Sequence, residues 1–149
     1  MTKTWSPRGK HIAIDQSEVY SGYTAAIATV SPEKGLVHLK LKEQAITIDD
    51  FLPYLRKLSK KMGNTPFYLF MDQLRVHTST TTKDECAKHC IYPIYNVTAS
   101  PDFNPIETVF SSVKKKYSRA RLNALANGKP FNQDREVRKA FECVTPELV

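Results

Sequence analysis

The acidic residues Asp72 and Glu107 stand where a carboxylate could serve chemistry. Asp72 follows the apolar segment 66–71, and Glu107 falls in the first turn of a helix predicted to begin after Asn104. Magnesium prefers oxygen ligands, and two carboxylates can weakly hold one such ion. Each acid also has a structural interpretation. Glu107, three residues after Asn104, fits a capping box, and Asp72 can cap the turn that follows a strand.

A basic run follows Glu107 on the same predicted helix. Its cationic residues, with Tyr117 between them, are Lys114, Lys115, Lys116, Arg119 and Arg121. Phosphate contacts require positive charge and no particular base sequence, so this run is the candidate DNA-binding segment. The alternative is a solvated helix end. The net charge of +7, from 22 Lys and Arg against 15 Asp and Glu, favours nucleic acid among acidic partners.

Cysteine usage and hydropathy narrow the class of protein. Cys86, Cys90 and Cys143 are an odd number of thiols, which does not favour a disulfide framework. Cys86, His89 and Cys90 could face a metal ion from one predicted helix, but no second ligand pair at zinc-finger spacing accompanies them. We therefore expect ordinary thiols. No apolar run approaches the roughly 20 residues of a transmembrane helix, and residues 1–10 lack the apolar core of a signal peptide. An intracellular protein with no membrane partner is expected.

Hydrophobic periodicity predicts one α/β domain over residues 1–149. The expected strands are residues 11–15, 24–31, 36–42, 66–71 and 91–97. The expected helices run from Asp49 or Asp50 to Gly63, from a Thr82–Glu85 capping box to about Cys90, from Pro105 to about Arg119, and over 133–144, with a polar connection at 120–131. In the third strand Leu39 and Leu41 alternate with Lys40 and Lys42, which predicts a basic face.

Several segments, taken in order, resemble the catalytic domain of mariner-like DDE transposases. They are TWSPRG at 4–9, VSPEKG at 30–35, a strand ending in Asp72 with His77 five positions later, and SPDFNPIE at 100–107. The match runs from about Trp5 to about Arg119, which implies a domain core of about 5–119 followed by a helical extension of about 120–149. The resemblance implies a ribonuclease-H-like mixed sheet with flanking helices.

The resemblance also implies a reaction: phosphodiester hydrolysis and strand transfer with two Mg²⁺ ions, held by three carboxylates. Asp72 and Glu107 match the second and third. The first is expected upstream of Trp5, where four residues stand and none is acidic, so the domain is expected to lack or replace the family's first strand. Asp15 follows the Trp5 segment and is not expected to substitute as a ligand.

Two further departures weaken the expected site. Gln73 stands where the family usually has Asn, and the family's helix-turn-helix DNA-binding region is not matched. We therefore expect a catalytically inactive, transposase-derived accessory subunit of a nuclear DNA-acting complex, for example a DNA adenine methyltransferase assembly. It would bind DNA and protein subunits and need no cofactor. The alternative is a Mg²⁺-dependent endonuclease, active alone or completed by a partner.

Overall fold

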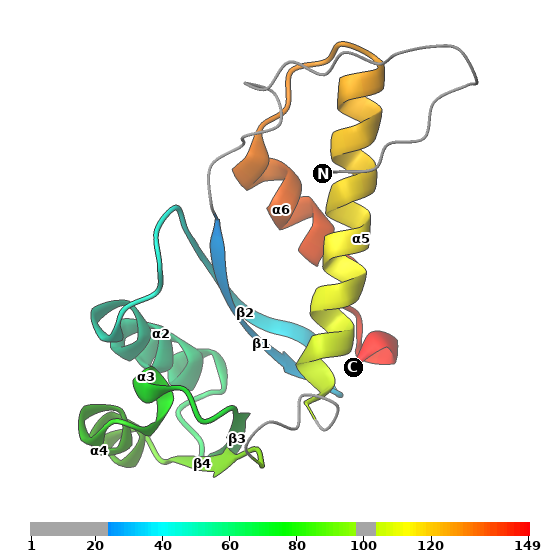
Figure 1. Ribbon diagram of the computed structural model, residues 1–149. Helices are drawn as coiled ribbons and strands as arrows, with labels where there is room; N and C mark the ends of the chain where they lie inside the picture. The colour runs from blue at the N-terminus through cyan, green and yellow to red at the C-terminus, as the bar shows by residue number, and fades with distance from the viewer. Residues whose placement is uncertain (1–23, 98–103) are drawn as a thin grey trace.

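The computed structural model describes residues 24–97 and 104–149, and Figure 1 shows how their elements are arranged. The predicted strand 11–15, the TWSPRG segment and Asp15 lie outside these ranges, as do residues 100–103 of the SPDFNPIE motif. The sequence predictions for those residues stay predictions.

A β-hairpin forms the centre of the fold (Figure 1). Its strands, β1 (Ala25–Ser31) and β2 (Gly35–Lys42), pair antiparallel, as the sequence predicts. Gly35 closes the turn with a φ of +64°, which a residue without a Cβ adopts without strain. The register shifts between Thr29 and Val30, and Val37 has no partner across the pair. This bulge changes which side chains of β2 face each side of the hairpin.

The two faces of the hairpin pack against two separate hydrophobic clusters. One cluster is built on α2 (Ile48–Lys61), β3 (Phe67–Met71), α4 (Thr80–Lys88) and β4 (Ile91–Tyr95), and Ile27 of the hairpin packs against it. The other is built on α5 (Pro105–Ala126) and α6 (Gln133–Phe141), with the 3₁₀ turn Pro146–Leu148 beside it. Ala26, Ala28, Leu39 and Leu41 pack against this second cluster. The hairpin therefore lies between the two clusters and packs against both.

The strands β3 and β4 form a parallel pair, with Phe67 opposite Ile91 and Met71 opposite Tyr95. In the described part of the chain the sheet is thus two separate two-stranded sheets, one antiparallel and one parallel. The predicted α/β class is confirmed. Within residues 24–97 and 104–149, no strand forms hydrogen bonds with both the β1–β2 pair and the β3–β4 pair, so the two sheets stay separate.

The last predicted connection is wrong in its boundaries, because α5 continues to Ala126 instead of ending near Arg119. The segment 119–126 is rich in Ala, Leu and Arg, which have high helix propensity, and this outweighs its polar appearance. The helix stops at Asn127 and Gly128. Gly128 has a φ of +59°, and its N–H donates to the Leu125 carbonyl.

The predicted capping box at Thr82 and Glu85 is also wrong. The N-cap of α4 is Ser79, whose Oγ accepts from the Thr82 N–H at 3.2 Å. Thr82 is fully buried and donates to the Val76 carbonyl at 2.6 Å. Glu85 is buried and pairs with Arg56 on α2. Both side chains therefore make tertiary contacts instead of capping the helix.

The predicted basic face of β2 is tied to the first turn of α2. Lys40 and Lys42 reach the two carboxylate oxygens of Asp50 at 2.9 and 2.5 Å. Asp50 also completes a capping box with Thr47, the N-cap of the helix. The lysines, Lys42 foremost, hold the pKa of Asp50 well below its usual range. These two lysines are structural, so they leave α5 as the main candidate for phosphate contacts.

Candidate metal and nucleic-acid site

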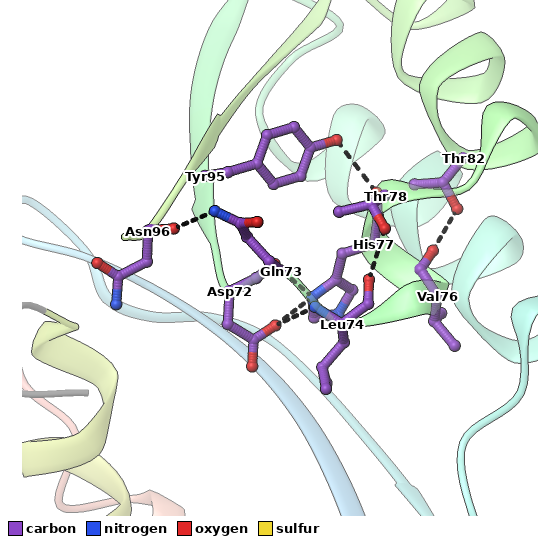
Figure 2. Close-up of polar contacts among 9 residues, drawn as sticks. All are labelled: Asp72, Gln73, Leu74, Val76, His77, Thr78, Thr82, Tyr95 and Asn96. Atoms are coloured by element: carbon purple, nitrogen blue, oxygen red, sulfur yellow. Dashed lines mark hydrogen bonds and ion pairs between the residues drawn. The ribbon is translucent and has the colours of Figure 1, made fainter. Parts of the chain in front are cut away.

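Asp72 lies directly after β3, at the carboxyl end of the parallel pair. Its side chain is half exposed, with 48% of the side-chain surface accessible to solvent. The contacts of one carboxylate oxygen, Oδ1, are the His77 Nδ1 at 2.5 Å and the Leu74 N–H at 3.5 Å. Figure 2 shows the carboxylate pointing away from Tyr95 and Asn96, with the His77 ring beside it. Asp72 thus caps the turn after the strand, as predicted, and still presents a carboxylate to solvent.

His77 sits in the one-turn helix α3 (Arg75–Thr78), which the sequence analysis did not predict. Its Nδ1 lies 3.2 Å from the Asp72 carbonyl and 2.5 Å from the Asp72 carboxylate. Both partners are acceptors, so Nδ1 carries the proton in this contact. The ring packs against Phe51 of α2, with ring centroids 4.8 Å apart, and the Tyr95 hydroxyl donates to the His77 carbonyl at 3.1 Å. His77 is therefore held in place and only 20% exposed.

Gln73 makes its hydrogen bond to the backbone at the strand ends and not to the exposed carboxylate of Asp72. Its amide donates to the Asn96 carbonyl at 2.8 Å (Figure 2). The Asn96 N–H in turn donates to the Met71 carbonyl at 2.8 Å. Gln73 thereby ties the end of β3 to the residue after β4.

Glu107 occupies the first turn of α5, as predicted. Asn104 is the N-cap, and its side chain accepts from the Ile106 N–H at 3.3 Å. The Glu107 side chain is exposed and makes no hydrogen bond or ion pair with any other residue of the described ranges. The side-chain half of the predicted capping box is thus not formed, and the carboxylate stays open at the helix N-terminus.

One face of α5 brings Glu107 together with three of the predicted phosphate ligands. An open groove runs along this face, and its lining residues are Glu107, Ser111, Lys114, Lys115, Ser118, Arg119, Leu122 and Asn123. These positions recur every three or four residues, so they share one side of the helix. Of the five predicted cations, Lys116 and Arg121 do not line the groove. Arg121 is half-buried and has an interaction of its own.

The donor set for a metal ion is incomplete in the described part of the chain. Asp72 and Glu107 offer exposed carboxylate oxygens, which suit Mg²⁺. They come from different elements, and residues 24–97 and 104–149 contain no group of three His, Cys, Asp or Glu side chains that could hold a metal. Asp72 and Glu107 are therefore the kind of ligand that suits such an ion, but within the described ranges they do not form a complete site.

Cys86 on α4, with His89 and Cys90 just after this helix, belongs to no group of three possible metal ligands in the described ranges. Cys86 is buried, and burial raises the pKa of its thiol to about 11, which opposes the thiolate that binds zinc. His89 lies 3.3 Å from Glu85, and Cys90 is exposed. The expectation of ordinary thiols stays a prediction. No helix in the described ranges is long and apolar enough to cross a membrane.

The contact at the candidate site that was not predicted from the sequence is the one between His77 and Asp72. The five-residue spacing was visible, but its meaning depends on the turn of α3 that folds residue 77 back onto residue 72. The position of Phe51, which supports the His77 ring, comes from the packing of a distant helix and leaves no local signal.

Comparisons with known proteins agree with this architecture. A family model described as "DDE superfamily endonuclease" matches residues 1–126. A search of curated proteins found no match. Among solved structures, the catalytic domain of Mos1 transposase with raltegravir and Mg superposes with a TM-score of 0.59 at 13% identity, covering 84% of this chain and 71% of that one.

Two larger assemblies match in the same way. The Mos1 paired-end complex with the left transposon end gives a TM-score of 0.62 at 14% identity, covering 98% of this chain and 47% of that one. The simian T-cell lymphotropic virus intasome gives 0.57 at 13% identity, covering 79% and 46%. The chain thus spans about half the length of these two relatives. The family match and the shared ribonuclease-H-like fold lead to one conclusion: the chain belongs to the DDE superfamily of endonucleases, and its fold is similar to that of the Mos1 mariner transposase catalytic domain.

Proposed function

We propose that this chain binds the DNA backbone through the groove of α5 and acts as an accessory subunit of a nuclear DNA-acting complex. The observation that carries the proposal is the clustering of Lys114, Lys115 and Arg119 on the one helix face that also holds Glu107. All three cations are exposed. They make no ion pair with any residue of the described ranges, unlike Lys40 and Lys42.

The dimensions of this face suit a phosphate backbone. Residues 114 to 119 cover about 7.5 Å along the helix axis, because each residue rises about 1.5 Å. One strand of duplex DNA carries a phosphate about every 3.4 Å along its axis. Three cations on this stretch can therefore contact two or three successive phosphates. Such contacts fix position and are indifferent to base sequence.

The binding half of the proposal is tested with a fluorescent duplex of arbitrary sequence, measured by anisotropy at two salt concentrations. We expect binding that weakens steeply as salt rises, and equal affinity for an unrelated duplex of the same length. An affinity that salt does not change, or no measurable binding at low salt, would refute DNA-backbone binding.

The accessory half of the proposal rests on the incomplete donor set. A two-metal reaction needs more ligands than Asp72 and Glu107, and the others have to come from outside the described residues or from another chain. Structures of the Mos1 relative include a transpososome and a paired-end complex, which are assemblies on DNA. We propose that this chain likewise works inside an assembly and does not cleave DNA by itself. A DNA adenine methyltransferase complex is one setting in which such a subunit could serve.

The test is purification of the tagged protein from its native cells, followed by mass spectrometry of the partners present in stoichiometric amounts. Recovery of a DNA-modifying enzyme would support the accessory role and identify the reaction. Recovery of the chain alone, with Mg²⁺-dependent nicking activity, would overturn it.

A second function, Mg²⁺-dependent endonuclease, is favoured by the exposed carboxylates of Asp72 and Glu107. Both would hold the ion, and a bound Mg²⁺ stabilises the charge that develops on phosphate oxygens. The test is nicking of supercoiled plasmid in Mg²⁺, with Asp72→Asn and Glu107→Gln as matched variants that keep side-chain size. Nicking by the wild type that both variants lose would establish this function. Nicking that survives in both would assign the activity to a contaminant.

A further inference from the structure

We infer that His77 is a positioning residue for Asp72: its Nδ1–H holds Oδ1 of the carboxylate and leaves Oδ2 to bind a divalent cation. The inference rests on the second proposed function, metal binding by Asp72. It assigns a role to a histidine that touches no DNA or metal itself in this scheme.

The contact engages one oxygen of the carboxylate and leaves the other open. His77 Nδ1 lies 2.5 Å from Oδ1, and the Leu74 N–H lies 3.5 Å from the same atom. Oδ2 has no hydrogen bond or ion pair with any residue in 24–97 or 104–149. The carboxylate of a half-exposed Asp would otherwise rotate among several orientations, and ordering it on binding would cost free energy. The histidine fixes the orientation beforehand.

The donor is held in place by contacts from two other elements, α2 and β4. The ring lies against Phe51 of α2, and the backbone of His77 accepts a hydrogen bond from Tyr95 of β4. The same Nδ1–H lies 3.2 Å from the Asp72 carbonyl, so it bridges the backbone and side chain of one residue (Figure 2). Removing such an outer partner of a metal ligand typically lowers metal affinity by about 10–100-fold.

Two substitutions separate the hydrogen bond from the ring packing. His77→Phe keeps a ring against Phe51 and removes the donor. His77→Asn loses the ring, but its Nδ2 lies where Nδ1 was and can donate to Oδ1. Mn²⁺ binding, followed by the electron paramagnetic resonance signal of the free ion, is the readout for the wild type, both variants and Asp72→Asn.

We expect His77→Phe to bind Mn²⁺ at least about tenfold more weakly than the wild type, and His77→Asn to stay within about threefold of it. Wild-type affinity in His77→Phe, together with loss in Asp72→Asn, would overturn the role of His77 and leave metal binding by Asp72 intact. Equal affinity in the wild type and Asp72→Asn would instead refute metal binding by Asp72, and with it the role inferred for His77.

A metal-independent measurement guards against a variant that fails to fold. The ¹⁵N chemical shifts of the wild-type imidazole report which ring nitrogen carries the proton. The geometry requires a protonated Nδ1, since both of its neighbours are acceptors. A wild-type ring with an unprotonated Nδ1 would overturn the inference without any substitution.

Discussion

The groove on α5 allows a quantitative prediction about the salt dependence of DNA binding. The perturbation is the triple substitution of Lys114, Lys115 and Arg119 by glutamine, which removes the cations that line the groove. Each phosphate contact on duplex DNA contributes about 0.9 to the slope of log K against log salt. Loss of three contacts should therefore reduce the slope by up to about 2.7.

This slope sets the size of the effect between two practical conditions. Between 50 and 200 mM salt, a slope of about 2.7 corresponds to roughly a 40-fold change in affinity. As salt rises from the lower to the higher concentration, the wild-type affinity should fall by this factor and by the further factor that its other DNA-contacting cations contribute. The triple variant should lose only the remainder, so the two proteins should differ most at low salt and converge at high salt. Fluorescence anisotropy with one duplex across a salt series measures both slopes.

The matched control changes the same number of charges elsewhere. Lys57 and Lys60 on α2 and Lys83 on α4 are exposed and lie outside the groove. Their joint replacement by glutamine lowers the net charge equally, so a general effect of charge would appear in both triples. We expect the control to change the slope by less than about 1. Equal changes in the two triples, or no change in the groove triple, would refute a phosphate-binding role for this face.

The neighbouring Lys116 provides a finer control, because it is exposed on the same helix yet does not line the groove. Lys115→Gln should therefore weaken binding more than Lys116→Gln, although the two positions are adjacent in sequence. The opposite order would place the DNA on a different side of α5.

Three further predictions concern the hairpin and can be checked by urea denaturation. Gly35→Ala should lower the free energy of unfolding by well over about 1 kcal/mol, since its Cβ would lie 2.5 Å from the Val144 carbonyl, whereas Gly63→Ala has similar backbone strain and open space and should cost less. Tyr54→Phe should cost about 1–2 kcal/mol by removing buried hydrogen bonds of its hydroxyl to Thr29 Oγ1 and the His38 carbonyl, with near-uv spectra confirming an unchanged core. The depressed pKa of Asp50 means that its stabilising effect is present above about pH 4 and lost as the pH falls, so Asp50→Asn should flatten the acid limb of the stability curve, and an unchanged limb would contradict this.

Local patterns predicted most of the elements, because the signals that start them are local. Asn104 followed by Pro105 marks the start of α5, and the structure has Asn104 as its N-cap. The alternation of Leu39 and Leu41 with lysines predicts the two faces of β2, which the packing confirms. The end of α5 was predicted too early because residues 119–126 are mostly Ala, Leu and Arg, which have high helix propensity.

Contacts between distant elements were beyond local patterns. The sequence pattern of Lys40 and Lys42 suggests a free basic face, but Asp50 on the next helix forms an ion pair with both lysines. Glu85 fitted a capping box by spacing, yet a buried carboxylate needs a cation, and Arg56 supplies it from another helix. Such ion pairs depend on which helices pack together, so no periodicity or spacing in the sequence predicts them.

The architecture makes the hairpin decisive for the candidate site. Asp72 and His77 lie beside the cluster around α2, β3 and β4, where the His77 ring contacts Phe51, while Glu107 and its cations belong to α5, which packs with α6. The two clusters lie on opposite faces of the β1–β2 hairpin (Figure 1). The position of the Asp72 carboxylate relative to the Glu107 carboxylate therefore depends on how both clusters pack against the hairpin. On one face of the hairpin, the Tyr54 hydroxyl forms hydrogen bonds with Thr29 and His38. At its turn, Gly35 has no side chain, which lets the backbone around Val144 approach closely. A hairpin substitution that leaves the protein folded should therefore impair any function that uses Asp72 and Glu107 together, and leave DNA-backbone binding by α5 alone largely unaffected.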